Sequence, residues 1–304
     1  MKATVLLNAK AGALVADGAS TRELVEQALN AEGVDARVLA VEHDALQDAI
    51  KEAAASNADV VVLGGGDGTL STGAAVLIGT SKPMGVLPLG TLNHFAKDLG
   101  IPLDLGGAAK VIALGHSVAI DVGEVNGHVF LNNSSIGLYP SAVDERDELR
   151  HREGGGKLVA MFHAAVDVMR RFPLLDVIVT SGDSTAALRV PFVFVGNNRY
   201  DMSLFSLGKR QSLQEGELGL YFTQTAGRLG ILRLAFLALV GRMRQDRDFH
   251  YMTLKAVEIR TRKRSLRVSM DGEVVHMTSP IRYSIKPGAL RVLTPKVEST
   301  PVKS

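Results

Sequence analysis

Four glycines surround a single aspartate in the stretch GGGDGT, residues 64–69. Glycine lets the backbone approach an anion without a Cβ in the way, and backbone N–H groups at the start of a helix favour a phosphate. A carboxylate repels phosphates unless a divalent cation lies between them, so Asp67 indicates a nucleotide bound with Mg²⁺, directly or through water. From these residues alone, a glycine-rich turn in which Asp67 caps the helix is an equal alternative.

A second glycine-containing turn lies in PLGTLNHFAKDLGIP, residues 88–102. It follows another apolar run and opens a helical pattern, and Thr91 and Asn93 supply side-chain donors or caps. If the two turns end neighbouring strands, they form one crevice at the carboxyl edge of the sheet, where nucleotides bind in open α/β folds.

The elements that would position these turns alternate between strands and helices. Apolar runs rich in β-branched residues predict buried strands, and apolar spacings of three and four residues predict helices. We expect strands at 4–7, 36–41, 59–63 and 84–90, and helices at 20–31, 44–55 and from Thr69 onward, with short helices up to Leu114. The strand at 59–63 is expected to end before Gly64, where the turn begins. This order is typical of a parallel, doubly wound sheet.

The pattern changes after about residue 117, where Asn126-Gly127 between alternating runs indicates a hairpin. Further strands are expected at 174–180, 190–196, 219–224 and 253–270, and helices at 157–171 and 229–245. We therefore expect an α/β domain over residues 1–120, to which the C-terminal segment of about 288–304 can return. A second, mainly antiparallel β-sandwich domain with inserted helices would span residues 121–287.

Composition narrows the classes of protein that fit. A chain of 304 residues with 46% hydrophobic and 22% charged residues is long enough for two domains with substantial cores. The absence of cysteine excludes disulfides, thiolate metal sites and cysteine nucleophiles, and it is compatible with a reducing cytoplasm. The first apolar run is too short for a signal peptide, and no segment is long enough to span a bilayer. We expect a cytoplasmic protein.

The ordered motifs NAKAG at residues 8–12, GGGDGT, PLGTLNHFAKDLGIP and DGE at residues 271–273 resemble the diacylglycerol kinase catalytic fold. That group includes bacterial diacylglycerol kinases, related lipid kinases and sphingosine kinases, and the resemblance covers nearly the whole chain. GGDGT alone is shared with NAD kinases and phosphofructokinases, whereas the second motif is specific to the lipid kinases. The resemblance implies a nucleotide-binding domain of the NAD kinase and diacylglycerol kinase type, with ATP and Mg²⁺ as cofactors, and a β-sandwich domain for a lipid substrate.

The resemblance also implies which residues bind the nucleotide. The first loop, the glycine-rich turn and the second turn would hold the ATP phosphates, the metal and the rest of the nucleotide. By position these residues are Asn8, Lys10 and Gly12, then Gly65, Gly66, Asp67, Gly68 and Thr69, then Gly90, Thr91 and Asn93, with Asp67 toward the metal.

The chain departs from the family pattern at several positions. Ala9 and Ala11 replace the proline and serine of the family's first loop, which is therefore expected to be less rigid. His94 replaces the aspartate of the family's NDFA, and a neutral imidazole lowers the negative charge available near Mg²⁺. Lys157 matches a lysine that opens a helix in the second domain, and it is equally compatible with a solvated first-turn lysine. The stretch VGNNRYDMS, residues 195–203, differs from the family's glycine-rich segment, so the acceptor pocket is expected to differ in shape.

Asp271 has two interpretations. Asp271-Gly272 between alternating strands is an ideal type I′ hairpin turn and needs no other explanation. The family's corresponding aspartate is proposed to take the proton from the lipid hydroxyl as it attacks the γ-phosphate, with Glu273 in the same polar network. With the other motifs present we favour Asp271 as the catalytic base, because phosphoryl transfer mainly needs alignment and charge neutralisation.

A basic patch over residues 228–267 holds 11 lysines and arginines against 3 acidic residues, in a chain whose net charge is +2. It combines a strongly apolar helix pattern with Arg260, Arg262 and Arg264 on one face of an expected strand. Cations beside an apolar surface suit peripheral contact with anionic lipid, whereas a helix covering the sandwich with arginines facing water is an equal alternative for the helix. Nucleic acid fits less well, because the patch lacks interleaved aromatic residues.

These observations favour an ATP- and Mg²⁺-dependent lipid kinase that transfers the γ-phosphate to a hydroxyl of a membrane lipid, diacylglycerol or a related one. ATP would bind between the domains, with the lipid head group beside Asp271. Two alternatives are a kinase of a soluble acceptor, of the NAD kinase type, and a catalytically weak protein that binds nucleotide or lipid.

Overall fold

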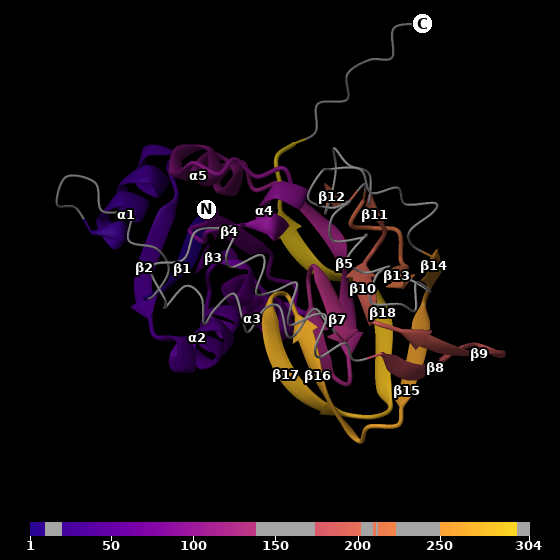
Figure 1. The fold of residues 1–304 in the computed structure, drawn as a ribbon. Helices are drawn as coiled ribbons and strands as arrows, with labels where there is room; N and C mark the ends of the chain where they lie inside the picture. The colour runs from indigo at the N-terminus through magenta and orange to yellow at the C-terminus, as the bar shows by residue number, and fades with distance from the viewer. Residues whose placement is uncertain (10–19, 138–173, 202–208, 211, 223–249, 297–304) are drawn as a thin grey trace, which may run out of the picture. The chain divides into compact units, whose positions relative to one another are not determined.

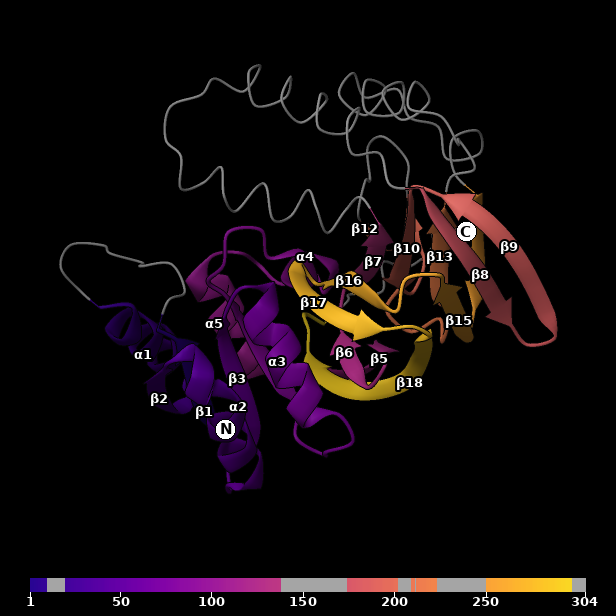
Figure 2. The same cartoon turned by 60° about the horizontal axis from the view of Figure 1, so that its bottom comes forward.

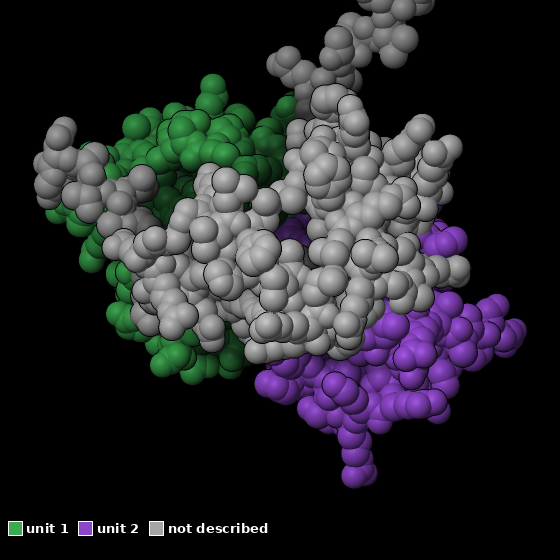
Figure 3. Space-filling model, in the orientation of Figure 1, with its two compact units in different colours: residues 1–120, 288–304 green, residues 121–287 purple. Residues whose placement is uncertain are grey.

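The computed structural model describes residues 1–9, 20–137, 174–201, 209–210, 212–222 and 250–296. The chain divides into two compact units, one comprising Met1–Ile120 with Gly288–Ser304 and the other Asp121–Pro287, coloured green and purple in Figure 3. Strands β5 (Ser117–Val125) and β18 (Ile281–Leu293) each contribute residues to both units.

The first unit is a parallel sheet between helices. Its strands are β1 (Lys2–Asn8), β2 (Asp35–Val41), β3 (Val60–Gly65) and β4 (Met84–Pro88), and its helices are α1 (Thr21–Ala31), α2 (His43–Ala55), α3 (Asp67–Leu77), α4 (His94–Asp98) and α5 (Leu105–Leu114). The strand order is β2-β1-β3-β4, and the end of β18 adds beside β4, where Val292 pairs with Met84. Helices α1 and α5 pack together on one side of the sheet, and α2 and α3 on the other (Figure 1). The expected parallel, doubly wound sheet is confirmed.

Local sequence explains where the first helix begins. The Ser20 hydroxyl accepts a hydrogen bond from the Glu23 N–H at 3.3 Å, and the Glu23 carboxylate accepts one from the Ser20 N–H at 2.8 Å. This reciprocal pair satisfies two backbone donors that a helix leaves unpaired at its start. Ser20 therefore caps α1.

The expected end of the third strand is wrong. Strand β3 continues through Gly64 and Gly65, which pair with Leu87 and Pro88 of β4, so the turn begins two residues later than Gly64. A Cβ on Gly64 would lie 2.4 Å from the Leu7 side chain, so this glycine allows β1 and β3 to pack closely. Helix α3 also begins earlier than expected, at Asp67 instead of Thr69.

Most strands of the second unit lie in two sheets, and β11 and β12 form a separate two-stranded sheet. Besides parts of β5 and β18, its strands are β6 (His128–Phe130), β7 (Asn133–Gly137), β8 (Leu175–Ser181), β9 (Ser184–Val190), β10 (Phe192–Asn197), β11 (Tyr200–Asp201), β12 (Lys209–Arg210), β13 (Leu218–Phe222), β14 (His250–Leu254), β15 (Ala256–Thr261), β16 (Ser265–Met270) and β17 (Glu273–Thr278). One sheet has the order β18-β15-β8-β9, with β5 and β6 beside β18, and the other has the order β14-β13-β10-β7-β16-β17. Buried aliphatic and aromatic side chains from both sheets, including Val177, Val195 and Tyr283, form one core.

Several expected elements of the second unit differ from the structure. The strand expected at 253–270 is divided among β14, β15 and β16. Strand β9 was not expected because its residues are small and mostly exposed, so its sequence, STAALRV, lacks the alternation of a half-buried strand. It forms an edge hairpin with β8 around Gly182, whose φ is 56° (Figure 2). The helices expected at 157–171 and 229–245 lie outside the described residues.

The expectation that Arg260, Arg262 and Arg264 share one face of a strand is wrong. Strand β15 ends at Thr261, whose hydroxyl donates to the Lys263 carbonyl at 2.8 Å and turns the chain toward β16. Arg260 therefore belongs to the strand, whereas Arg262 and Arg264 lie in the connection that follows. Among the described helices, none combines the length and the hydropathy needed to cross a bilayer.

Candidate active site

The two glycine-containing turns of the first unit touch through their backbones. They follow the neighbouring strands β3 and β4, and the Leu89 N–H donates to the Gly65 carbonyl at 3.2 Å. A Cβ on Gly90 would lie 2.4 Å from the Cα of Gly66, a distance that no packed carbon pair tolerates. Gly90 is therefore required for the two turns to meet at the carboxyl edge of the sheet.

Asn8, Gly65 and Thr69 form a small contact group beside these turns. A Cβ on Gly65 would lie 2.4 Å from the Thr69 hydroxyl oxygen, so the Thr69 side chain closes over Gly65. Asn8, at the end of β1, donates from Nδ2 to Thr69 Oγ1 at 3.1 Å. Thr69 is only 6% exposed, so in this structure it joins β1 to α3 and is not presented to solvent.

Asp67 joins the first turn to the helix that follows the second one. Its Oδ2 accepts a hydrogen bond from the His94 N–H at 3.2 Å, and its Oδ1 accepts one from the Phe95 N–H at 3.0 Å. These are N–H groups of the first turn of α4, so Asp67 caps α4 and not its own helix. The carboxylate thus holds the second turn in place, while the His94 side chain is exposed.

Asn93 shapes the second turn from within. Its backbone is left-handed, with φ of 51°, and its side chain is 6% exposed. Asn93 Oδ1 accepts from the Gly90 N–H at 3.0 Å, and Nδ2 donates to the carbonyls of Pro88 at 3.1 Å and Gly90 at 2.8 Å. Thr91 and Leu92 are exposed on the same turn. Of the two side chains expected to line the nucleotide crevice, Thr91 is accessible and Asn93 supports the backbone.

Other expected site residues divide into two groups. Gly66 and Gly68 are half-buried at the start of α3, beside Asp67. Lys10, Gly12 and Lys157 lie outside the described residues.

Asp271 lies in the hairpin turn that the sequence predicts, and its carboxylate is also bound by backbone N–H groups from another part of the second unit. Asp271 and Gly272 have φ values of 47° and 89°, as a type I′ turn requires. At the same time the Asp271 carboxylate accepts hydrogen bonds from the N–H groups of Leu131 at 2.8 Å, Asn132 at 2.7 Å and Asn133 at 3.1 Å. An ionised carboxylate accepts only, so these donors match its charged form and fix its position.

Glu273 is not joined to this group. It is exposed at the start of β17, where it pairs with Met270 across the hairpin. Within the described part of the chain, its carboxylate has no hydrogen bond.

A buried polar network next to the 131–133 segment is not predicted by the sequence analysis. Asp121, 2% exposed, accepts at Oδ2 from Asn198 Nδ2 at 2.8 Å and from the Gly216 N–H at 2.6 Å. Asn197 donates from Nδ2 to the carbonyls of Asp121 at 3.0 Å and Leu131 at 2.9 Å. Arg210 belongs to the same network. The paired asparagines at 197–198 were the only visible hint, and strand ends commonly carry such residues.

Oxygens of this network lack hydrogen bonds. The Oδ1 atoms of Asn197 and Asn198, both fully buried, and Ser135 Oγ receive no hydrogen bond from the residues that the structure describes. The Nδ2 atoms of both asparagines face oxygen acceptors, so the side-chain orientations are determined. Buried acceptors of this kind are normally satisfied by internal water.

Two tyrosines are buried near the network. Burial raises the pKa of Tyr283, whose hydroxyl lies 3.1 Å from Ser134 Oγ. Burial also raises the pKa of Tyr221, whose hydroxyl accepts from the Tyr200 N–H and donates to the Tyr200 carbonyl. Both phenols are therefore neutral structural groups at ordinary pH.

Residues 2–125 match the family model of the diacylglycerol kinase catalytic domain. A protein of Synechocystis named uncharacterized protein sll0036 is 26% identical over 241 residues, which are 77% of this chain and 54% of that protein. A probable lipid kinase YegS-like of Klebsiella pneumoniae is 38% identical over 133 residues, which are 42% of this chain and 44% of that protein. The chain thus matches about half, or less, of the length of these relatives.

Solved structures show the same fold over the whole chain. A putative diacylglycerol kinase from Bacillus anthracis superposes with a TM-score of 0.74 over 98% of both chains, at 22% identity. A structure described as a diacylglycerol kinase from the same organism gives a TM-score of 0.70 over 97% of both chains, at 21% identity. The expected fold class, an α/β unit with a parallel sheet and a mainly antiparallel β unit, is confirmed.

Proposed function

Because residues 2–125 match the family model of the diacylglycerol kinase catalytic domain, we propose that the chain is a lipid kinase that uses Mg²⁺ and ATP. It transfers the γ-phosphate to a hydroxyl of a membrane lipid, diacylglycerol or a related one. The observation that supports this most directly is the backbone contact between Gly66 and Gly90, which joins two glycine-containing turns at the carboxyl edge of β3 and β4. That edge is where open α/β sheets bind nucleotides.

In this proposal the first unit binds the nucleotide. Gly66 leads into α3 without a side-chain cap, so the first N–H groups of an 11-residue helix are suited to phosphate oxygens. Asn8, Gly65 and Thr69 form the floor, Gly68 lies in the first turn of α3, and Gly90, Thr91 and Asn93 make the opposite turn. Lys10 and Gly12 would complete the phosphate-side loop.

The residues present fit a magnesium ion that is held mainly by phosphate and water. Among the described residues there is no cluster of three acidic or histidine side chains that could hold a metal by themselves. Each carboxylate oxygen of Asp67 accepts one hydrogen bond from a backbone N–H of α4. A carboxylate oxygen can accept more than one such bond, so each can also bind a cation. Mg²⁺ commonly binds to one or two carboxylates together with substrate phosphates and waters, so Asp67 alone would suffice. When bound, the ion would neutralise charge on the transferring phosphoryl group.

The second unit would supply the acceptor side of the reaction. In this proposal Asp271 is the base that receives the proton of the lipid hydroxyl, because three backbone N–H donors hold its carboxylate in a fixed position. Glu273, at the start of β17 in the same hairpin, is proposed as a second carboxylate on the acceptor side.

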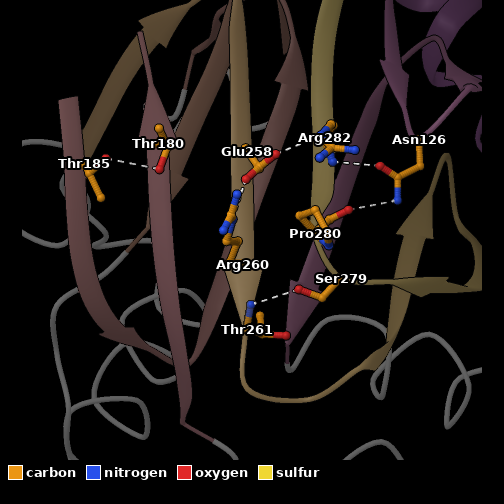
Figure 4. Close-up of polar contacts among 9 residues, drawn as sticks. All are labelled: Asn126, Thr180, Thr185, Glu258, Arg260, Thr261, Ser279, Pro280 and Arg282. Carbon is orange, nitrogen blue, oxygen red and sulfur yellow. Dashed lines mark hydrogen bonds and ion pairs between the residues drawn. The ribbon is translucent and has the colours of Figure 1, made fainter. Parts of the chain in front are cut away.

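Membrane contact is proposed for the outer face of the sheet β18-β15-β8-β9, called the arginine face here. Arg260 and Arg282 both bind Glu258, through Nε–O distances of 2.5 and 2.8 Å, and Arg189 and Arg262 both lie against Asp176, at 3.5 and 3.8 Å (Figure 4 shows the first group). Each carboxylate neutralises only one of its two arginines.

The arginine face also carries apolar surface. Ile178 is 45% exposed at its centre and lines a groove of about 580 Å³ with Ala187 and Leu188. Excess positive charge around an apolar centre suits a bilayer that contains anionic lipids. This contact would make the protein a cytoplasmic one that associates peripherally with membranes.

The test is transfer of labelled γ-phosphate from Mg-ATP to a panel of lipids in mixed micelles. We expect a labelled lipid with the unmutated protein and a loss of at least about 100-fold with Asp67→Ala and Asp271→Ala. Asp48→Ala and Asp183→Ala serve as matched controls, since Asp48 is on the surface of α2 and Asp183 is in the exposed turn between β8 and β9.

Other outcomes would replace the proposal. Labelling of a soluble acceptor such as NAD, with no labelled lipid, would indicate the NAD kinase type of activity. ATP binding with no transfer to any acceptor would indicate a nucleotide-binding protein with little catalysis.

A further inference from the structure

The peptide group between Leu131 and Asn132 connects a buried cation to an anion. Its carbonyl oxygen accepts a hydrogen bond from Arg210 Nη1 at 2.6 Å, and its N–H donates to Asp271 Oδ1 at 2.7 Å. Arg210 Nη2 also donates to Asn132 Oδ1 at 3.1 Å. Arginine, one peptide group and the carboxylate of Asp271 therefore form a continuous chain of hydrogen bonds.

Arg210 is held rigidly on its side of this chain. It is 8% exposed and pairs with Tyr200 between the short strands β12 and β11, with its guanidinium carbon 5.5 Å from the centre of the Tyr200 ring. Nη1 also donates to the Asn197 carbonyl at 3.1 Å. The guanidinium is planar, with donors in fixed directions, so these acceptors specify one orientation.

Asp271 depends on the other side of the same segment. Its carboxylate accepts hydrogen bonds from three backbone N–H groups of residues 131–133, and its own N–H donates to the Asn133 carbonyl at 2.9 Å. Any shift of this segment would therefore move the carboxylate. Arg210, together with Asn197, fixes the segment from behind, because both donate to the Leu131 carbonyl.

We propose that Arg210 is a positioning residue for Asp271, acting through the Leu131–Asn132 peptide group. It fixes that group in place, and its charge polarises the amide so that the Asn132 N–H becomes a stronger donor to the carboxylate. The inference rests on the proposed function, in which Asp271 accepts the proton of the acceptor hydroxyl. Arg210 itself contacts neither the hydroxyl nor the phosphate.

If the role of Arg210 were purely structural, replacing it would have a different effect on activity. A buried arginine that only ties β12 to the segment before β7 would, when replaced, lower the stability and the fraction of active protein regardless of residue 271. A positioning role requires that the loss of activity passes through Asp271. The two roles are separated by combining substitutions at both residues.

The first experiment is a double-mutant cycle on lipid phosphorylation with Arg210→Gln and Asp271→Asn. We expect Arg210→Gln to lower kcat by about 10-fold or more with the KM for ATP nearly unchanged, because small misplacements of a catalytic group are costly. In the Asp271→Asn background the same change should lower kcat by less than about 2-fold. Losses that multiply in the double variant would overturn the proposal.

Two further variants control this cycle. Arg210→Lys keeps the charge but loses the planar fork, and we expect it to recover part of kcat; it replaces Arg210→Gln in the cycle if that variant does not fold. Arg291→Gln removes an exposed arginine that donates to the Ser117 hydroxyl at 2.8 Å and has no role in the proposed site, and it should leave kcat unchanged.

A spectroscopic experiment tests the coupling without any activity. Labelling leucine carbonyl carbons with ¹³C and asparagine nitrogens with ¹⁵N selects the Leu-Asn pairs, which occur at Asn8, Asn30, Asn93 and Asn132. In Arg210→Gln the Asn132 amide proton should move upfield, as expected for a weaker hydrogen bond to Asp271, while the other three, all in the first unit, stay in place.

The failures are distinguishable. No lipid phosphorylation by the unmutated protein would reject the proposed function, whereas the Asn132 resonance would still report the coupling. An Asn132 resonance that does not respond to Arg210→Gln would reject this inference, whatever the activity.

Discussion

Gly66 and Gly90 belong to equivalent motifs, but their surroundings differ. A Cβ on Gly90 would lie 2.4 Å from the Gly66 Cα, whereas a Cβ on Gly66 would lie 3.5 Å from the Gly90 Cα, which is ordinary contact. The first glycine is therefore suited to ligand approach, and the second is required by packing.

This difference leads to a prediction at the residue scale. Gly90→Ala should lower the free energy of unfolding by about 2 kcal/mol, since backbone atoms cannot move aside easily. Gly66→Ala should lower it by less than about 1 kcal/mol but weaken ATP binding, because its methyl group would stand where phosphate approaches. Urea denaturation and ATP titration measure the two effects. Equal loss of stability in both variants would contradict the packing argument.

The residues of the candidate site also show what sequence alone can predict. The order of motifs pointed to Asp67 and Asp271 as candidate site residues. The backbone N–H groups that their carboxylates bind could not be predicted from the spacing of the motifs. Asp67 caps the helix of the other turn, and Asp271 binds a segment about 140 positions earlier in the chain. Arg210 was not identified, because a lone arginine in a polar stretch has no periodic or motif signal.

At the scale of elements, the arginine face depends on the register between neighbouring strands. Glu258 of β15 lies opposite Arg282 of β18, and the side chain of Arg260 reaches it along the same strand. Hydrogen bonds from Arg260 and then Arg282 lower the pKa of Glu258. Glu258 therefore stays ionised from neutral pH down to below its ordinary value of 4.5.

On the arginine face, two substitutions are predicted to change membrane binding in opposite directions. Glu258→Gln should strengthen binding to vesicles that contain phosphatidylserine by about 5-fold, and Arg260→Gln should weaken it by a similar factor, because each changes the charge by one unit near the surface. Flotation of the protein with vesicles at low and moderate salt measures both effects. If neither substitution changed vesicle binding, or if binding did not weaken at higher salt, another surface of the protein would contact the membrane.

Element prediction succeeded where the sequence has clear periodicity and failed where exposure removes it. The parallel strands of the first unit are buried on both faces and read as continuous apolar runs. Strand β9 lies at a sheet edge, so few of its residues need to be apolar, and no pattern marks it. The strand expected at 253–270 was too long because alternation continues through the connections between β14, β15 and β16.

At the scale of the whole molecule, the buried tyrosines make stability depend on alkaline pH. The pKa of Tyr283 is raised above its ordinary value of 10.0 in the folded state, so its contribution is fully present below that pH and is lost as pH rises through the folded value. Above pH 10 the unfolded chain loses a proton that the folded protein keeps, which favours unfolding.

Tyr283→Phe tests this dependence. The variant should lose about 1 kcal/mol at neutral pH, from the missing hydrogen bond to Ser134. Above pH 10 its stability should fall less steeply than that of the unmutated protein, by up to about 1.4 kcal/mol per pH unit. Urea denaturation between pH 8 and 11 measures both. Parallel curves for the two proteins would contradict the assignment.

Strand β18 has a consequence for how the chain is made. Val292 pairs with Met84 of β4, the Ala289 carbonyl accepts from Gly79, and the Thr294 N–H donates to the His116 carbonyl. On the ribosome, β4 therefore keeps an unpaired edge until β18 has been synthesised, after the whole second unit. During that interval β4 exposes an apolar edge that a chaperone, or another nascent chain, can bind.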